Sequence, residues 1–311
     1  MRPTFPAGRE KRWRTADPMS ERVNMPVVMQ GDLEIAYEII GEGEPYILTG
    51  GGRFSKDAGG VRELAEAIAD RGKKVVIYDR LNCGASAVCF EGSSESVMQA
   101  ESLARLIVDL DLGPTVLLGG SGGARISLLA AARHPEIARA VVMWWPSGGA
   151  FGSMSLAEVY NFPSIRAAWN GTMADVADDP TWAEVITRNP RNRDRFLAQD
   201  KQTFIETMER WAHVYCACGN PLVAGLTDEE AAAITLPVLV FRSGKSDYFH
   251  TRATSERLAA NLQNAEIIDP VWGDREFLDR YEDSRDNGVS VWINWKQLAP
   301  QIVDWTEKVL D

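Results

Sequence analysis

Histidine is scarce in this sequence: 311 residues include three, His134, His213 and His250. No histidine follows position 250, so chemistry that needs an imidazole has three candidates and none near the C-terminus. Cysteine is scarce as well, and the four cysteines are too few and too scattered for a disulfide scaffold. Cys216 and Cys218 have no second Cys or His pair at a matching spacing, which excludes a zinc knuckle. We therefore expect reduced thiols and a cytoplasmic protein.

The sequence also lacks a long apolar run and an excess of basic residues. No apolar stretch approaches the ~20 residues that a transmembrane helix requires. The formal net charge of −11 argues against nucleic acid or an anionic membrane as a partner. Residues 1–24 are basic and aperiodic, without the continuous apolar region of a secretory signal. We expect them to form a disordered leader, with Met19 and Met25 as alternative starts.

What is present is an alternation of short apolar runs with helical patterns. Hydrophobic residues make up 45% of the chain and charged residues 25%, which is ordinary for a globular protein. The runs predict strands over 31–40, 46–48, 74–78, 116–118, 140–145, 236–241 and 265–268, and helices over 61–69, 96–112, 124–134, 254–262 and 300–310. This alternation predicts an α/β fold, with a mostly parallel central sheet and helices on both faces.

The pattern changes between residues 147 and 235. Helical stripes occur there, such as Phe204, Met208, Trp211 and Tyr215 on one face, and no convincing strand. We predict a core formed by 25–146 and 236–311, with 147–235 inserted as a helical cap over the carboxyl ends of the strands. The long connection 275–298 is expected to fold over the mouth of the site.

The most informative stretch runs from 116 to 126. An apolar run reaches Gly119-Gly120-Ser121-Gly122-Gly123 and then takes on helical spacing. Gly-x-Ser-x-Gly between a strand and a helix is the pattern of a nucleophile elbow. The glycines let strand and helix approach closely, and the helix N-terminus favours negative charge that develops near Ser121. The plain alternative is a glycine-rich turn without a catalytic role, but the flanking strand and helix favour the elbow.

Further motifs follow the order found in α/β-hydrolases, which the chain resembles from about Asp32 to its C-terminus. Gly50-Gly51-Gly52 resembles the oxyanion loop of that family, although Thr49 stands where a histidine is common. Residues 79–86 resemble the family's Asp-x-x-Gly-x-Gly-x-Ser turn. Residues 242–247 resemble the Gly-x-x-Asp motif that supplies the acid of the catalytic triad.

This resemblance implies a set of roles and no cofactor or metal. Ser121 would be the nucleophile and Asp247 the triad acid. The backbone N–H groups of Gly51 and Gly122 would form the oxyanion hole.

The sequence departs from the family where the triad histidine is expected, after the last strand. There the chain has Gly273-Asp274 in place of a Gly-His pair. A carboxylate such as Asp274 is a weak base toward a serine hydroxyl, because its ordinary pKa is about 4. Asp274 and Trp272 remain as further candidates for the site, although a tryptophan is more often a packing residue.

The three histidines differ as substitutes for the missing base. His134 ends the helix after Ser121, where it would interact with the helix C-terminus. His213 is on the opposite face of its helix from Trp211, beside charged residues, which is typical of a solvated face. His250 follows Asp247 by three residues at the carboxyl end of a strand, where sites in open α/β sheets gather. It reaches Ser121 if the loop curls inward, with Asp247 or Asp274 orienting its ring; otherwise it packs under the loop.

The leading hypothesis is a serine hydrolase that cleaves an ester or lactone of a small apolar or aromatic substrate. The alternatives are a hydrolase-fold protein that binds a small molecule with little or no turnover, and a hydrolase of C–C bonds. Arg53 either meets an anionic group of the substrate or is an exposed loop residue. The expected partner is the small-molecule substrate alone, and the sequence leaves a homodimer open.

Overall fold

The computed structural model describes residues 25–216 and 221–310, so the expected leader at 1–24 lies outside the described residues. The strands are β1 (Val27–Gln30), β2 (Leu33–Ile40), β3 (Glu44–Thr49), β4 (Lys73–Tyr78), β5 (Thr115–Gly120), β6 (Ala138–Trp144), β7 (Val238–Phe241) and β8 (Ala265–Ile268). The helices are α1 (Val61–Ala69), α2 (Glu95–Asp109), α3 (Gly122–Arg133), α4 (Gly149–Tyr160), α5 (Phe162–Asn170), α6 (Met173–Ala177), α7 (Ala183–Arg188), α8 (Arg191–Leu197), α9 (Lys201–Val214), α10 (Asp228–Ala233), α11 (Arg252–Asn261), α12 (Glu276–Asn287) and α13 (Ala299–Leu310). Short 3-10 turns cover Pro135–Ile137, Pro180–Trp182 and Ile293–Leu298.

The strands of the described ranges form one sheet in the order β1-β2-β4-β3-β5-β6-β7-β8. The pairs β1–β2 and β2–β4 are antiparallel, and every other neighbouring pair is parallel. The predicted fold class, a mostly parallel α/β sheet, is therefore confirmed. Because β3, β5, β6 and β7 run in one direction, the loops at their carboxyl ends meet at the same edge of the sheet.

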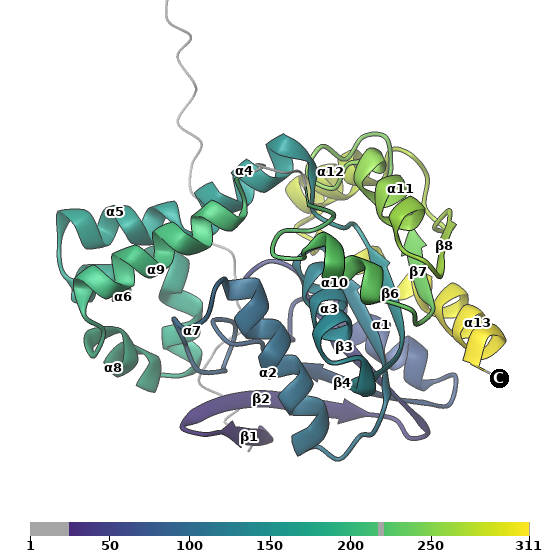
Figure 1. Ribbon diagram of the computed structural model, residues 1–311, viewed down its shortest axis with the longest axis horizontal. Helices are drawn as coiled ribbons and strands as arrows, with labels where there is room; N and C mark the ends of the chain where they lie inside the picture. Colours follow the sequence, from purple (N-terminus) through teal and green to yellow (C-terminus); the bar gives the residue numbers. More distant parts are fainter. Residues whose placement is uncertain (1–24, 217–220, 311) are drawn as a thin grey trace, which may run out of the picture.

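Helices cover both faces of this sheet (Figure 1). One apolar layer joins the sheet to α1 and α13, and includes Leu64 and Ile302. The other joins it to α2, α3 and α11, and includes Leu103, Leu128 and Leu258. The central strand β5 is buried along its whole length, as expected for a strand with a helical layer on each side.

The N-terminal edge differs from the sequence prediction. The pattern predicted one strand over 31–40, but the structure has a turn at Gly31 and Asp32 between two antiparallel strands, β1 and β2. Gly31 has φ 68°, a left-handed conformation that glycine adopts without strain. Strand β1 was missed because it is a four-residue edge strand, Val-Val-Met-Gln, in which apolar and polar residues do not alternate.

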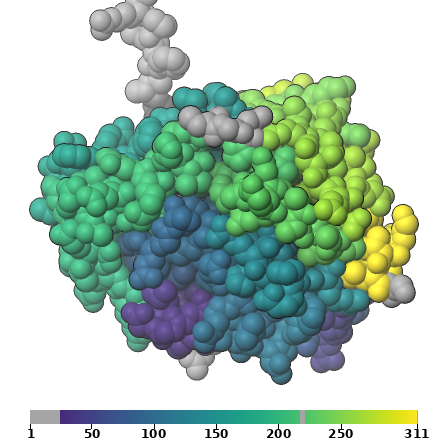
Figure 2. Space-filling view, viewed as in Figure 1, coloured from purple at the N-terminus to yellow at the C-terminus, as the bar shows by residue number. Residues whose placement is uncertain are grey.

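Between β6 and β7 the described chain is helical and contributes no strand to the sheet; an isolated bridge pairs Gly148 with His250. We call the segment from α4 to α9 the cap. It lies to one side of the sheet in Figure 1, and the space-filling view shows it against the part of the core that contains α2 (Figure 2). Phe90 of the core packs against Trp182, Phe196 and Phe204 of the cap. The next helix, α10, packs on α3.

No helix in the described ranges combines the length and the apolar character needed to cross a bilayer.

Candidate active site

Ser121 occupies the turn between β5 and α3 in a strained conformation, with φ 55° and ψ −118°. Its N–H donates to the carbonyl of Trp144 at 3.0 Å. A Cβ added at Gly119 would lie 2.3 Å from a backbone oxygen of Gly123, and one added at Gly123 would lie 2.0 Å from that of Thr49. Only glycine fits at these two positions, so the Gly-x-Ser-x-Gly sequence produces a tight turn that leaves the serine half-buried.

The structure brings Ser121, His250 and Asp247 into one hydrogen-bonded chain. Ser121 Oγ lies 2.9 Å from His250 Nε2, and His250 Nδ1 lies 2.9 Å from Asp247 Oδ2. A proton on Nδ1 satisfies the second contact, which leaves Nε2 free to accept from the serine hydroxyl. The serine therefore contacts one nitrogen of a ring whose other nitrogen is hydrogen-bonded to a buried carboxylate.

The loop after β7 holds this pair in place through its own backbone. Asp247 Oδ1 accepts the N–H groups of Phe249 at 2.9 Å and His250 at 2.8 Å. Thr251 then caps α11 by accepting the N–H of Thr254. The loop curls inward because the Asp247 side chain binds the backbone two and three residues further on, and because α11 begins right after its N-cap, Thr251.

Arg280 from α12 contacts the other side of Asp247. Its Nη2 lies 3.2 Å from Asp247 Oδ2, and both side chains are buried. Burial raises the pKa of Asp247, but the hydrogen bond from His250 and the charges of His250 and Arg280 outweigh it, so this pKa lies below the ordinary value. Asp247 is therefore a carboxylate at neutral pH.

Trp145 packs against both Arg280 and the histidine ring. The Arg280 guanidinium sits 3.6 Å from the centroid of Trp145, whose rings stack on His250 at 6.1 Å and an interplanar angle of 28°. Trp145 has φ 49°, which is strained for a bulky residue. Ser121 and Trp145, which directly follow the neighbouring strands β5 and β6, are thus both strained.

Glu276 lies one turn before Arg280 on α12, 3.8 Å from its Nε. Burial raises the pKa of Glu276 to about 7, although the Arg280 charge opposes the shift. This carboxyl group therefore titrates near neutral pH.

The glycine loop after β3 approaches the serine from the other side. A Cβ on Gly51 would lie 3.1 Å from Ser121 Cβ, and the backbone nitrogen of Gly52 lies 3.6 Å from the corresponding position on Gly122. Within the described chain, the N–H groups of these three glycines donate no hydrogen bond. Sequence reasoning selected Gly51 and Gly122; the structure adds Gly52 as a third free donor.

Arg80 fixes the orientation of this loop. Its Nη2 donates to the carbonyl oxygens of Gly51, at 3.2 Å, and of Gly52. The C=O and N–H of a trans peptide point in opposite directions, so the Gly51 carbonyl held by Arg80 turns the Gly52 N–H away from that arginine.

Two candidates from the last-strand loop do not reach Ser121. The carboxylate of Asp274 is paired with Lys245, at 2.9 Å, and with Arg252 on the surface, so it contacts neither the serine nor the histidine. We leave it out of the proposed site, because these two basic residues hold it outside. Trp272 packs on Trp145 with ring centroids 5.5 Å apart.

The other two histidines lie on other elements, α9 and the end of α3. His134 ends α3 and its Nε2 contacts Glu101 at 2.6 Å, while His213 is exposed on α9. Three cysteines are free thiols: Cys83 and Cys89 are buried and Cys216 is exposed. Cys218 lies outside the described residues. No group of three His, Cys, Asp or Glu side chains in the described part of the chain is arranged to hold a metal ion.

Sequence reasoning missed Arg280 and Arg125 beside the site. Arg125 is 3% exposed in the first turn of α3, and the signal was available, since it is a lone charge among Ala124, Ile126 and Leu128. Arg280 gave no such signal, because α12 is rich in charged residues throughout.

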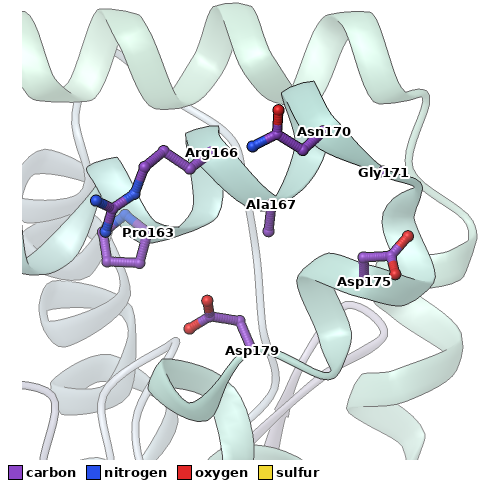
Figure 3. A pocket seen from close by; sticks show the side chains of 7 residues that line it. All are labelled: Pro163, Arg166, Ala167, Asn170, Gly171, Asp175 and Asp179. Atoms are coloured by element: carbon purple, nitrogen blue, oxygen red, sulfur yellow. The ribbon is translucent and has the colours of Figure 1, made fainter.

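A depression of about 390 Å³ on the cap is unrelated to this geometry (Figure 3). It is lined by residues of α5 and α6 and the segments that follow them, including Arg166, Asn170 and Asp179, and none of the residues above contributes to it.

The comparisons with known proteins agree with this architecture. Residues 47–273 match the family model described as alpha/beta hydrolase fold, so the chain belongs to that family. The prediction of the superfamily is confirmed, and the expectation of a hydrolase agrees with it. A search of curated proteins found no match.

Solved structures share the fold at low sequence identity. Est816, described as an N-acyl homoserine lactone degrading enzyme, is 18% identical, with 91% of this chain and 99% of that chain covered and a TM-score of 0.55. The enol-lactonase from Burkholderia xenovorans LB400 is 19% identical, with coverage of 91% and 100% and a TM-score of 0.54. A thermophilic esterase from Thermogutta terrifontis is 17% identical, with coverage of 92% and 97% and a TM-score of 0.56.

Proposed function

We propose that this protein hydrolyses a carboxylic ester or lactone of a small substrate, with Ser121 as nucleophile, His250 as base and Asp247 as the acid that orients it. The observation that carries the proposal is the hydrogen-bonded chain in which Ser121 Oγ, His250 Nε2, His250 Nδ1 and Asp247 Oδ2 are joined by two contacts of 2.9 Å. The esterases and lactonases of the same fold support this class of substrate.

The reaction follows from the geometry. Ser121 Oγ attacks the carbonyl carbon while His250 Nε2 takes the hydroxyl proton. The negative charge that forms on the carbonyl oxygen is stabilised by the free N–H groups of Gly51 and Gly122, with Gly52 beside them. The imidazolium gives its proton to the alkoxide as the C–O bond breaks, which leaves an acyl-serine; the alcohol departs from an ester, whereas in a lactone it stays on the acyl chain as a hydroxyl group.

Water completes the cycle at the same site. His250 takes a proton from the water as it attacks the acyl-serine, and then returns it to Ser121 Oγ as the acid is released. Asp247 stays ionised throughout and keeps the ring in the required tautomer, because its pKa lies below the ordinary value.

The test compares turnover of 4-nitrophenyl butyrate and δ-valerolactone by the full-length protein and three variants. Ser121→Ala should lose measurable hydrolysis and labelling by a fluorophosphonate, while His250→Ala should lower kcat at least about 100-fold. His213→Ala is the matched control and should retain full activity, since that ring is exposed on the cap.

Full turnover by Ser121→Ala would reject the serine mechanism, and full turnover by His250→Ala would reject the base. If the unaltered protein neither hydrolyses these substrates nor takes the label, the small-molecule binding protein becomes the better description.

A further inference from the structure

Three arginines come from segments that adjoin Ser121 or the glycine loop, and one carboxylate pairs with one of them. Arg53 follows the glycine loop, Arg80 follows β4, and Arg125 lies four residues after the serine on α3. Arg53 Nε and Nη2 bind the two oxygens of Glu95 at 3.1 and 3.0 Å. Arg80 and Arg125 are 4% and 3% exposed, and neither forms an ion pair with another described residue. Two buried positive charges at the site are therefore uncompensated.

Such an arrangement is unfavourable for folding unless it has another use. A buried charge without an ionic partner is destabilising, and proteins normally pair it. Acidic residues are not in short supply here, because the chain has 44 Asp and Glu against 33 Lys and Arg.

Arg125 and Arg53 also keep unused hydrogen-bond donors. Arg125 Nε donates to Ser96 Oγ at 2.7 Å and its Nη2 to the Tyr215 hydroxyl at 3.3 Å, but its Nη1 is buried without a partner. Arg53 Nη1 is likewise buried without a partner. Arg80 differs, because carbonyl and amide oxygens accept from both of its terminal nitrogens.

The charges of Arg125 and Arg80 lie next to the nucleophile. Arg125 Nη2 and Arg80 Nη1 are each 3.8 Å from the position that a Cβ on Gly122 would occupy, directly after Ser121. An anionic group held there would be a few bonds from the carbonyl that the serine attacks.

Two tyrosines, Tyr160 of the cap and Tyr215 directly after it, pack against two of these arginines. The guanidinium of Arg53 is 5.2 Å from the ring of Tyr160 and that of Arg125 is 5.4 Å from the ring of Tyr215, and the two rings are 6.5 Å apart. Burial raises the pKa of Tyr160 to about 12 although the three arginines oppose it, so its hydroxyl remains a neutral donor.

We propose that Arg125 and Arg53 bind a carboxylate of the substrate beside the carbonyl attacked by Ser121. Preferred substrates are then acidic: half-esters of dicarboxylic acids, or lactones that bear a carboxylate. Guanidinium groups suit this role because their planar donors match the two oxygens of a carboxylate. This inference rests on the proposed hydrolase function and deepens it.

The test uses pairs of probe esters that differ only in charge. The charged members are the mono-4-nitrophenyl esters of adipic, pimelic and suberic acid, and the neutral members are the same compounds with the free carboxyl group methylated. For at least one chain length, kcat/KM should be at least about 10-fold higher for the acid than for its methyl ester, the size of one charge-assisted hydrogen bond.

Variants assign this preference to the arginines. Arg125→Met should lower kcat/KM for the acid about 10- to 100-fold and for the methyl ester less than about 3-fold. Arg166→Met removes the same charge from the outer side of the cap, where the side chain is exposed, and should leave both unchanged. If Arg125→Met does not fold, Arg53→Lys replaces it in the test, because this variant keeps a positive charge beside Glu95 but lacks the Nη1 donor.

Failure of this inference can be separated from failure of the hydrolase function. Adipate should bind to Ser121→Ala in isothermal titration calorimetry, and the added Arg125→Met or Arg53→Lys change should abolish or weaken that binding whether or not any ester is cleaved. A preference for the methyl esters at every chain length, an equal effect of Arg125→Met on both ester classes, or adipate binding that neither change weakens would overturn the carboxylate site.

Discussion

Replacing Arg280 with Gln removes the guanidinium that faces Asp247 and should change how activity depends on pH. In the structure Arg280 and His250 contact the same carboxylate oxygen, so a proton added to the histidine would bring two positive charges close together. Without Arg280 the histidine is protonated more easily, and a protonated histidine cannot accept the serine proton. Activity should therefore begin to fall at a higher pH as the solution is acidified.

The size of this shift follows from the distances. Arg280 Nη2 and His250 Nδ1 lie 3.2 and 2.9 Å from Asp247 Oδ2, so they are at most about 6 Å apart. Two unit charges at that separation interact by about 0.7 kcal/mol at the dielectric constant of water and by about 2.8 kcal/mol at an effective constant of 20. The midpoint of the acid side of the kcat/KM profile should rise by about 0.5 to 2 pH units.

The assay is hydrolysis of 4-nitrophenyl butyrate from pH 4.5 to 8.5, followed at a wavelength where absorbance does not depend on ionisation of the product. Arg280→Lys keeps the charge and should restore the midpoint, even though it loses the stacking on Trp145. Arg275→Gln removes an exposed arginine five positions earlier in the chain and should shift the midpoint by less than about 0.3 units, since solvent screens that charge. An unchanged or lower midpoint in a folded Arg280→Gln protein would refute this electrostatic role.

Two further predictions concern stability. Burial raises the pKa of Glu276 to about 7 from an ordinary 4.5, so its stabilising contribution is complete below pH 4.5 and is lost as the pH rises through about 7. The free energy of unfolding should then fall by about 2–3 kcal/mol more between pH 5 and 8.5 in the unaltered protein than in Glu276→Gln, and parallel denaturation curves would contradict this. Gly123→Ala should destabilise the fold by more than about 2 kcal/mol, because the new Cβ would lie 2.0 Å from the carbonyl oxygen of Thr49. Gly273→Ala, with no atom within 4 Å of the new Cβ, should stay within about 0.5 kcal/mol in the same thermal melts, and equal stability of the two variants would show that the close approach is absent.

The sequence predicted the sheet well because its central strands are continuous apolar runs between clear turn signals. The helix at 61–69 and the strand at 265–268 have the same bounds in the structure as in the pattern. Helix α12 was not predicted as a helix, since its charged residues carry no clear apolar stripe. Its position against Asp247 depends on a contact between residues 33 positions apart, which no local pattern encodes.

The candidate site, like the fold, was predicted in part from local sequence, and the rest depends on contacts that local sequence does not encode. Local sequence placed Ser121 in its elbow, and it placed His250 three residues from Asp247 with two alternatives for the direction of the ring. The choice between them depends on how a loop curls, which is decided by hydrogen bonds from Asp247 to the backbone of the same loop. The roles of these residues in catalysis stay predictions, to be tested by the variants above.

The short spacing between Asp247 and His250 has a mechanical consequence. The two side chains share one turn, in which Asp247 also accepts the backbone N–H of His250, so we expect a motion of the β7 loop to displace them together. In a triad whose base and acid lie on separate loops, thermal motion can break the serine–base contact and the base–acid contact independently. Here one contact links separate segments: the contact between His250 Nε2 and Ser121 Oγ, which joins the β7 loop to the β5 elbow. Heating that loosens the fold without unfolding it should therefore break the contact between His250 and Ser121 first, while the histidine ring stays hydrogen-bonded to Asp247.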